Sequence, residues 1–198
     1  MNQYLLQKIL ESFEMLISVW DAGRVERPED DAVTRLVLEL HRYNYLIWHE
    51  EDKARRTNAR SLEIAAVKRN IDRLNQKRND SIERVDEWLL KNSFGHLADL
   101  DLPMRTETPG SAFDRLSVLA LKVFHMEEQT ERADVQQTHI NACRDRLRIL
   151  RRQQMDLRES LQAMLSDLAG GKIRMKVYRQ FKMYNDPDLN PEIYGNKE

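Results

Sequence analysis

The sequence predicts an all-α protein: a bundle of about five helices, built on two long antiparallel hairpins and followed by an extended C-terminal tail. The first supporting observation is compositional. Among 198 residues 41% are hydrophobic and 33% charged, with 6 glycines and 5 prolines, a balance typical of long solvated helices. The second is periodic, because apolar residues recur at steps of three and four, the spacing of one helix face.

A third observation is an internal similarity. The segment Trp48-His49-Glu50-Glu51 recurs as Phe124-His125-Met126-Glu127, and the apolar positions that follow the two segments also match. The two hairpins are either copies of one ancestral hairpin or unrelated hairpins that share an amphipathic pattern. Both alternatives give the same bundle, because neither hairpin buries its apolar face alone.

Three helices are expected in the first half of the chain. The first covers about residues 4–20 and ends before Gly23, a natural helix stop. The second begins at Pro28, which suits a first helical turn, and runs to about Arg55. We expect a reversal between residues 56 and 61 with Ser61 as N-cap, because one unbroken helix would be far longer than globular helices are.

The second half begins with a long connection. Thr108 and Pro109 form the start of a fourth helix, and a fifth begins near Asp134, where Gln137 completes a capping box, and ends at Gly170. Alternating apolar residues after Gly170 predict an extended tail lying on the bundle or on a second copy. We divide the single domain, 1–198, into a first helix plus hairpin (1–91), a connection (92–111), a second hairpin (112–170) and the tail (171–198).

Charge and cysteine content narrow the setting. The net charge of −1 provides no overall field to attract nucleic acid or an anionic membrane, so neither is an expected partner. No apolar run reaches the roughly 20 residues of a membrane-spanning helix, and charged residues interrupt any signal sequence near the start. The single cysteine, Cys143, fits a reduced, cytoplasmic environment.

Polar residues interrupt the apolar stripe of the first hairpin. Asn75, Arg78 and Asn79 lie along the inner edge of the third helix. If the chain reverses near residue 58, Glu39 is level with Arg78, and Asn44 lies near Asn75. Buried polar groups need partners, so these residues form a network. Such a network either only fixes the helix register or lines a ligand pocket with Asn44, Asn75, Arg78 and Asn79.

His49 and Asp52 lie three residues apart on one helix face, and His125 repeats the arrangement, as in dimetal helical bundles. The predicted hairpins argue against a metal, because Lys68 is level with His49 and Arg144 with His125. We therefore expect ion pairs, without metal or cofactor. His49, Asp52 and Lys68 remain ligand-binding candidates.

A third group of candidates lies at the start of the fourth helix. Thr108 and Ser111 surround the first free N–H groups, with Arg115 one turn further on. These groups could receive a phosphate or a carboxylate. The alternative is that Thr108 only caps the helix.

At several of these positions the chain resembles a bacterial family known only as the domain of unknown function numbered 4254. The similar segments are Asn-Tyr-Leu-Ile-Trp-His-Glu-Glu-Asp at residues 44–52, Ile-Ala-Ala-Val-Lys-Arg-Asn-Ile-Asp at 64–72, Thr-Pro-Gly-Ser at 108–111 and Met-Tyr-Asn-Asp-Pro at 183–187. The resemblance implies a helical bacterial protein without an established activity. The piece Asp-Arg-Leu-Ser at 114–117 is also similar to one in proteins linked to surface-glycan synthesis.

Together these observations favour a non-catalytic binding or interaction protein. Its ligand would be anionic, a phosphosugar or nucleotide sugar, or its partner would be a glycosyltransferase; a homodimer is a further candidate. The alternative is a metal-dependent hydrolase of phosphorylated small molecules or nucleotides, with Glu51, Asp52 and Glu83 as its acids. The same residue count separates Glu51 from Glu83 by roughly 25 Å, too far to share one ion.

Overall fold

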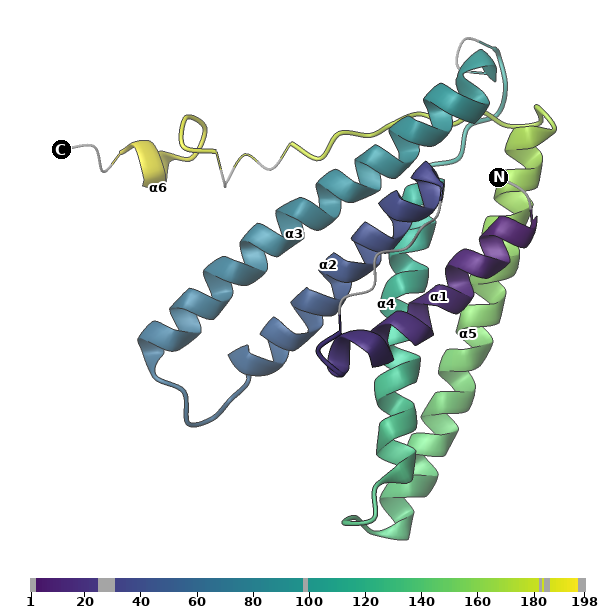
Figure 1. The fold of residues 1–198 in the computed structure, drawn as a ribbon. Helices are drawn as coiled ribbons and strands as arrows, with labels where there is room; N and C mark the ends of the chain where they lie inside the picture. Colours follow the sequence, from purple (N-terminus) through teal and green to yellow (C-terminus); the bar gives the residue numbers. More distant parts are fainter. Residues whose placement is uncertain (1–2, 25–30, 98–99, 182, 184–185, 196–198) are drawn as a thin grey trace.

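The computed structural model describes residues 3–24, 31–97, 100–181, 183 and 186–195, and it is all-α, as predicted. Helices α2 and α3 form one antiparallel hairpin, α4 and α5 form the other, and α1 lies across them (Figure 1). A π-helical turn, Leu90–Phe94, and a 3₁₀ turn, Gly95–Leu97, follow α3. The helices are α1 (Gln3–Asp21), α2 (Ala32–Ala54), α3 (Ser61–Leu89), α4 (Pro109–Glu131), α5 (Gln137–Ala169) and the short α6 (Pro191–Tyr194).

The hydrophobic core is shared by the five long helices. Each contributes at least one fully buried side chain, as shown by Phe13 of α1, Leu40 of α2, Val85 of α3, Phe113 of α4 and Leu161 of α5. Burying a side chain of this size stabilises the fold by roughly 2 kcal/mol. The two hairpins therefore bury their apolar faces against each other.

The predicted reversal between α2 and α3 is confirmed, since α2 ends at Ala54 and α3 begins at Ser61. The predicted partner of Glu39 is wrong by more than one turn of α3. Arg84, not Arg78, donates to Glu39, at 2.8 Å. The residue count assumed side chains level with their Cα atoms, whereas long helical side chains lean toward the N-terminus of their own helix. In an antiparallel pair, the lean of the side chain on α2 and the lean of the side chain on α3 both move the contact to a higher-numbered residue of α3.

The helix starts are confirmed in part. Thr108 caps α4, its Oγ1 accepting from the Ser111 N–H at 3.2 Å. The start of α5 was predicted too early. Its N-cap is Gln136, because the carboxylate of Asp134 is held by Arg132 at 2.6 Å instead. The predicted start at Pro28 lies outside the described residues.

The N-terminus of α2, as described, is set by Asp31. Its Oδ1 accepts from the N–H groups of Val33 at 3.1 Å and Thr34 at 3.3 Å, an N-cap arrangement. At the start of α3, one residue earlier than predicted, Arg60 takes the N-cap position and its N–H donates to Glu63.

The tail follows its alternating pattern without forming a sheet. Ile173 and Met175 are buried in the core, and one parallel bridge joins Met104 to Arg174. The tail then leaves the bundle along α3 and ends in α6, well away from the other helices (Figure 1). None of the described helices is both long and apolar enough to cross a membrane.

Candidate functional site

A buried chain of hydrogen bonds crosses the bundle from α1 to α4. His41 Nε2 lies 3.0 Å from the Phe13 carbonyl oxygen, and His41 Nδ1 lies 2.8 Å from Ser117 Oγ. Asn44 Nδ2 donates to Ser117 Oγ at 3.0 Å and to Asp114 Oδ1 at 2.8 Å. A carbonyl only accepts, so His41 carries its proton on Nε2, and Ser117 must donate to Nδ1. The donor and the acceptor of each hydrogen bond in this network are therefore fixed.

Burial keeps the His41 end of this hydrogen-bond network uncharged. His41 is completely buried, and this burial lowers the pKa of its imidazole to about 3, so the ring is neutral near pH 7. The ring also stacks on Phe13, with centroids 4.4 Å apart. The network fixes the orientation of Asn44 and, through it, one oxygen of Asp114.

Asp114 lies on the wall of a cavity between α3 and α4. The cavity has a volume of about 480 Å³, within the usual range for small-molecule sites. Its polar lining residues are Asp72, Asn75, Arg78, Asn79, Ser111, Asp114, Arg115 and Gln180.

Five of the predicted site residues line this cavity: Asn75, Arg78, Asn79, Ser111 and Arg115. Asn44 bonds to α4 and supports the wall from behind through Asp114. The cavity is therefore formed where the predicted polar edge of α3 meets the first turns of α4.

Arg78 has spare hydrogen-bonding capacity within this cavity. Its Nε lies 3.8 Å from Asp114 Oδ1, an ion pair but too long for a hydrogen bond. The Nε atom is buried and has no hydrogen-bond partner among the described residues. The Arg78 side chain is still 29% exposed, so the accessible part of its guanidinium can donate to an anionic oxygen in the cavity.

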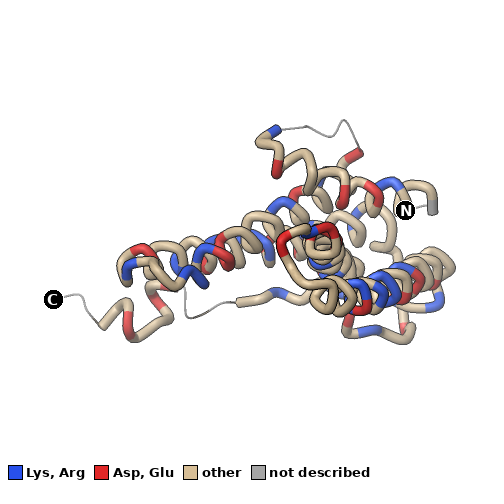
Figure 2. The backbone as a smooth tube through the Cα atoms, turned by 90° about the horizontal axis from the view of Figure 1, so that it is seen from below, with Lys and Arg blue, Asp and Glu red and all other residues tan. Residues whose placement is uncertain are grey.

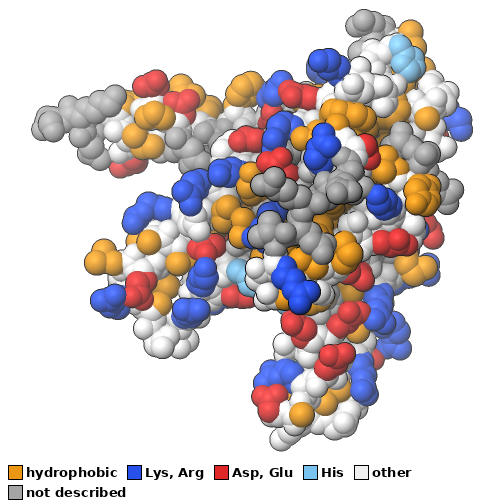
Figure 3. All heavy atoms as spheres, in the orientation of Figure 1, with side chains coloured by type: hydrophobic (Ala, Val, Ile, Leu, Met, Phe, Trp, Pro, Cys, Tyr) orange, Lys and Arg blue, Asp and Glu red, His pale blue; other side chains and the backbone are white. Residues whose placement is uncertain are grey.

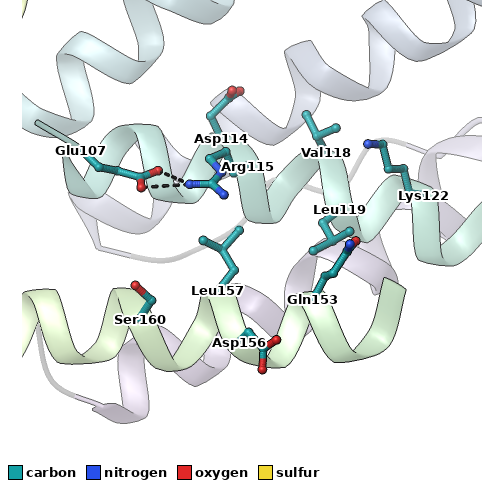
Figure 4. A pocket seen from close by; sticks show the side chains of 10 residues that line it. All are labelled: Glu107, Asp114, Arg115, Val118, Leu119, Lys122, Gln153, Asp156, Leu157 and Ser160. Carbon is teal, nitrogen blue, oxygen red and sulfur yellow. Dashed lines mark hydrogen bonds and ion pairs between the residues drawn. The ribbon is translucent and has the colours of Figure 1, made fainter. Parts of the chain in front are cut away.

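A second cavity, of about 600 Å³, lies between α4 and α5 and shares Asp114 and Arg115 with the first. Figure 4 shows Leu119 next to Gln153, Leu157 pointing from α5 toward α4, and Glu107 bonded to the guanidinium of Arg115. Both Glu107 oxygens accept from Arg115 Nη1, at 2.7 and 2.9 Å. Arg115 thus stands between the two cavities.

The expected anion at the start of α4 is supplied by the protein itself. Asp86 of α3 accepts from the Gly110 N–H at 2.7 Å, and burial raises the pKa of this carboxyl to about 6. Thr108 caps the helix and also bonds to Asp86. Among the predicted site residues, Thr108 is therefore occupied by these internal contacts.

His49, Asp52 and Lys68 lie outside both cavities. His49 does not face Lys68; its Nε2 lies 3.4 Å from Asp21 of α1, and its ring packs edge-on against Tyr45. Likewise His125 stacks on Trp48, with centroids 4.8 Å apart, rather than facing Arg144. Asp52 and Lys68 are exposed.

The acids of the hydrolase alternative have other partners. Glu51 accepts from Arg55 on its own helix, at 2.7 Å. Glu83 accepts from the tail, from Arg179 at 3.0 Å and from the Gln180 N–H at 2.8 Å. In the described part of the chain, no group of three or more His, Cys, Asp or Glu side chains is arranged to hold a metal ion.

Sequence reasoning missed His41, Ser117 and the role of Asp114. The available signal was a pair of polar residues three apart on each of two helices: His41 and Asn44 on α2, Asp114 and Ser117 on α4. Two such pairs, each within an apolar stripe, satisfy each other when the helices pack.

Comparison with known proteins supplies a family but no activity. The family model described as "Protein of unknown function (DUF4254)" matches residues 34–177, from α2 into the tail, including most lining residues of both cavities. No curated protein and no solved structure matches the chain. The match covers well over half of the sequence, and the chain therefore belongs to the DUF4254 family.

Proposed function

We propose that the protein binds a phosphorylated sugar, a phosphosugar or nucleotide sugar, in the cavity between α3 and α4, and that it acts as a binding protein without catalysis. The phosphate would lie on Arg78 and Arg115, and the sugar hydroxyl groups on the carboxylates and amides around them. The observation that carries the proposal is the partly exposed guanidinium of Arg78, which lines the cavity and approaches Asp114 no closer than 3.8 Å.

The charge balance of the cavity supports this class of ligand. Two arginines, Arg78 and Arg115, oppose two aspartates, Asp72 and Asp114, so the lining carries no net charge. A polyphosphate alone would be repelled by the carboxylates. A sugar carrying phosphate uses both kinds of group, because hydroxyls donate to carboxylates while phosphate oxygens accept from guanidinium groups. The adjoining cavity gives room for the larger nucleotide sugar.

The cellular location and the partner of the protein are also part of the proposal. The one cysteine, Cys143, is free and buried, which supports a reducing compartment such as the cytoplasm as location. A glycosyltransferase that takes up the ligand is the proposed partner. The hydrolase alternative gains no support from Glu51 and Glu83, which are held by Arg55 and by the tail.

Thermal denaturation with added ligand tests the proposal. Glucose 1-phosphate and UDP-glucose should raise the melting temperature, whereas glucose and inorganic phosphate should do so far less. A ligand at a hundred times its Kd stabilises the folded state by about 2.7 kcal/mol. In Arg78→Gln, affinity should fall by about tenfold or more, because a charged hydrogen bond is lost.

Arg73→Gln is the matched control. Arg73 lies on the same helix but is exposed and bonds only locally, to Asn70. This variant should keep the wild-type shift. Equal shifts in both variants, or no shift with any phosphorylated sugar, would contradict the proposed site.

A further inference from the structure

We infer that residues 186–195, here called the C-terminal arm, dock on an arginine-lined groove along α5 of a second copy of this chain. The inference is independent of the proposed ligand. It rests on an apolar, acidic segment that its own bundle leaves uncovered, and on a complementary surface on another helix.

The C-terminal arm is both apolar and acidic. Leu189, Ile193 and Tyr194 are 50%, 42% and 48% exposed, and α6 contains no buried residue. The arm carries three acids, Asp186, Asp188 and Glu192, and no lysine or arginine. Figures 1 and 3 show it standing off the body of the molecule. Three large apolar side chains, half exposed and close together in the sequence, give the arm a surface that a partner can cover.

The complementary surface is on α5. A groove of about 510 Å³ is lined by four arginines around Leu147 and Met155: Arg144, Arg148, Arg151 and Arg152. Residues 143–155 contain five arginines and one acid. Figure 2 shows red acidic residues on the arm next to the C-terminus.

The groove on α5 combines positive charge with exposed apolar surface. Met155 is 53% exposed, and so is the neighbouring Ile149, at 57%. Within the described residues, the ion pairs of Arg148 and Arg152 are with exposed acids of α5, at 2.7 and 3.1 Å. A guanidinium has five N–H donors, so these arginines can bind a further carboxylate.

The geometry of the chain favours a second copy as the occupant. Arg179 and Gln180 fix the tail to Glu83 on α3. Helix α3 packs on α2 and α4, whereas α5 packs on α4 from the other hairpin, and the arm points away from α5 (Figure 1). Exchange of arms between two copies closes a twofold dimer and repeats each contact twice.

Sedimentation equilibrium of the full chain tests the inference. The wild type should be a dimer that dissociates on dilution. Arg144→Glu with Arg148→Glu should weaken the dimer by about tenfold or more, and so should Asp188→Arg with Glu192→Arg, because each places like charges opposite one another. Combining all four substitutions should restore it.

Arg146→Glu is the matched control, since Arg146 is exposed on α5 but does not line the groove, and it should leave the dimer intact. The substituted side chains are exposed, so circular dichroism should show folded proteins throughout. A wild type that stays monomeric would overturn the inference. So would a dimer insensitive to both pairs of substitutions, or a monomer whose α5 arginines bind an RNA oligonucleotide instead.

Discussion

The Gly110→Ala variant is expected to lose about 3 kcal/mol of unfolding free energy or more. Gly110 lies in the first turn of α4, where this helix touches α3. A Cβ atom there would lie 2.6 Å from the Ile82 carbonyl oxygen and 2.9 Å from the Asp86 carboxyl. The first of these atoms belongs to the backbone and cannot rotate away. The two hairpins would have to separate at this point, and the hydrogen bond from the Gly110 N–H to Asp86 would lengthen.

Urea unfolding followed by circular dichroism measures this loss, and a variant that does not fold would also agree with it. Gly170→Ala is the control, because Gly170 has an ordinary φ of −82° and a Cβ there would need only a few tenths of an ångström of adjustment, at 3.3 Å from the Ser166 carbonyl oxygen. The free energy of unfolding of the control should lie within about 0.5 kcal/mol of the wild-type value. If Gly110→Ala behaved like the control, α4 could not lie against α3 as described.

The second large effect is the response of stability to acid. Burial lowers the pKa of His41 to about 3, from 6.5 in the unfolded chain. The stability that neutral His41 contributes is present above pH 6.5 and is lost as the pH falls toward 3. The full loss is on the order of 5 kcal/mol. We therefore expect His41 to drive acid unfolding.

Asp86 acts in the opposite direction. Burial raises the pKa of its carboxyl from 3.8 to about 6. Its contribution is fully present below pH 3.8 and is lost as the pH rises through 6. When the pH falls, Asp86 therefore adds on the order of 3 kcal/mol to the free energy of unfolding. This gain offsets part of the loss from His41. The wild type should lose little stability between pH 7 and pH 4.

Asp86→Asn separates the two effects. An asparagine keeps an acceptor for the Gly110 N–H but does not titrate, so the offset disappears. Between pH 7 and pH 4 the variant should lose about 2 kcal/mol more than the wild type. Urea unfolding over this pH range measures the difference, with Asp80→Asn as control, since Asp80 is exposed on the same helix. Parallel curves for the wild type and Asp86→Asn would contradict the assignment.

Some helix boundaries were predictable because they depend on local signals, although the start of α5 was not. The gap between Ala54 and Ser61 and the cap at Thr108 were both anticipated from the sequence. Contacts between helices were harder. Glu39 was assigned to Arg78 but binds Arg84, because the lean of side chains along a helix does not show in a residue count.

The candidate site illustrates the same limit. Five of its residues were found, since polar interruptions of an apolar stripe on α3 are visible in the sequence. Asp114 and Ser117 were not assigned, because their importance depends on His41 and Asn44 of another helix. The contacts of His49 were predicted wrongly because they also depend on another helix. The expected neighbour was on α3, whereas α1 supplies the actual one, Asp21.

The central claim is that the cavity between α3 and α4 binds a phosphorylated sugar. A titration of the ¹⁵N-labelled protein with glucose 1-phosphate, followed by NMR, tests it most directly. Our proposal predicts that the largest shifts occur in the backbone amides of Asn75, Asn79 and Ser111 and in the side-chain Nε–H of Arg78. Shifts confined to the α5 groove, or none at saturating ligand, would contradict it.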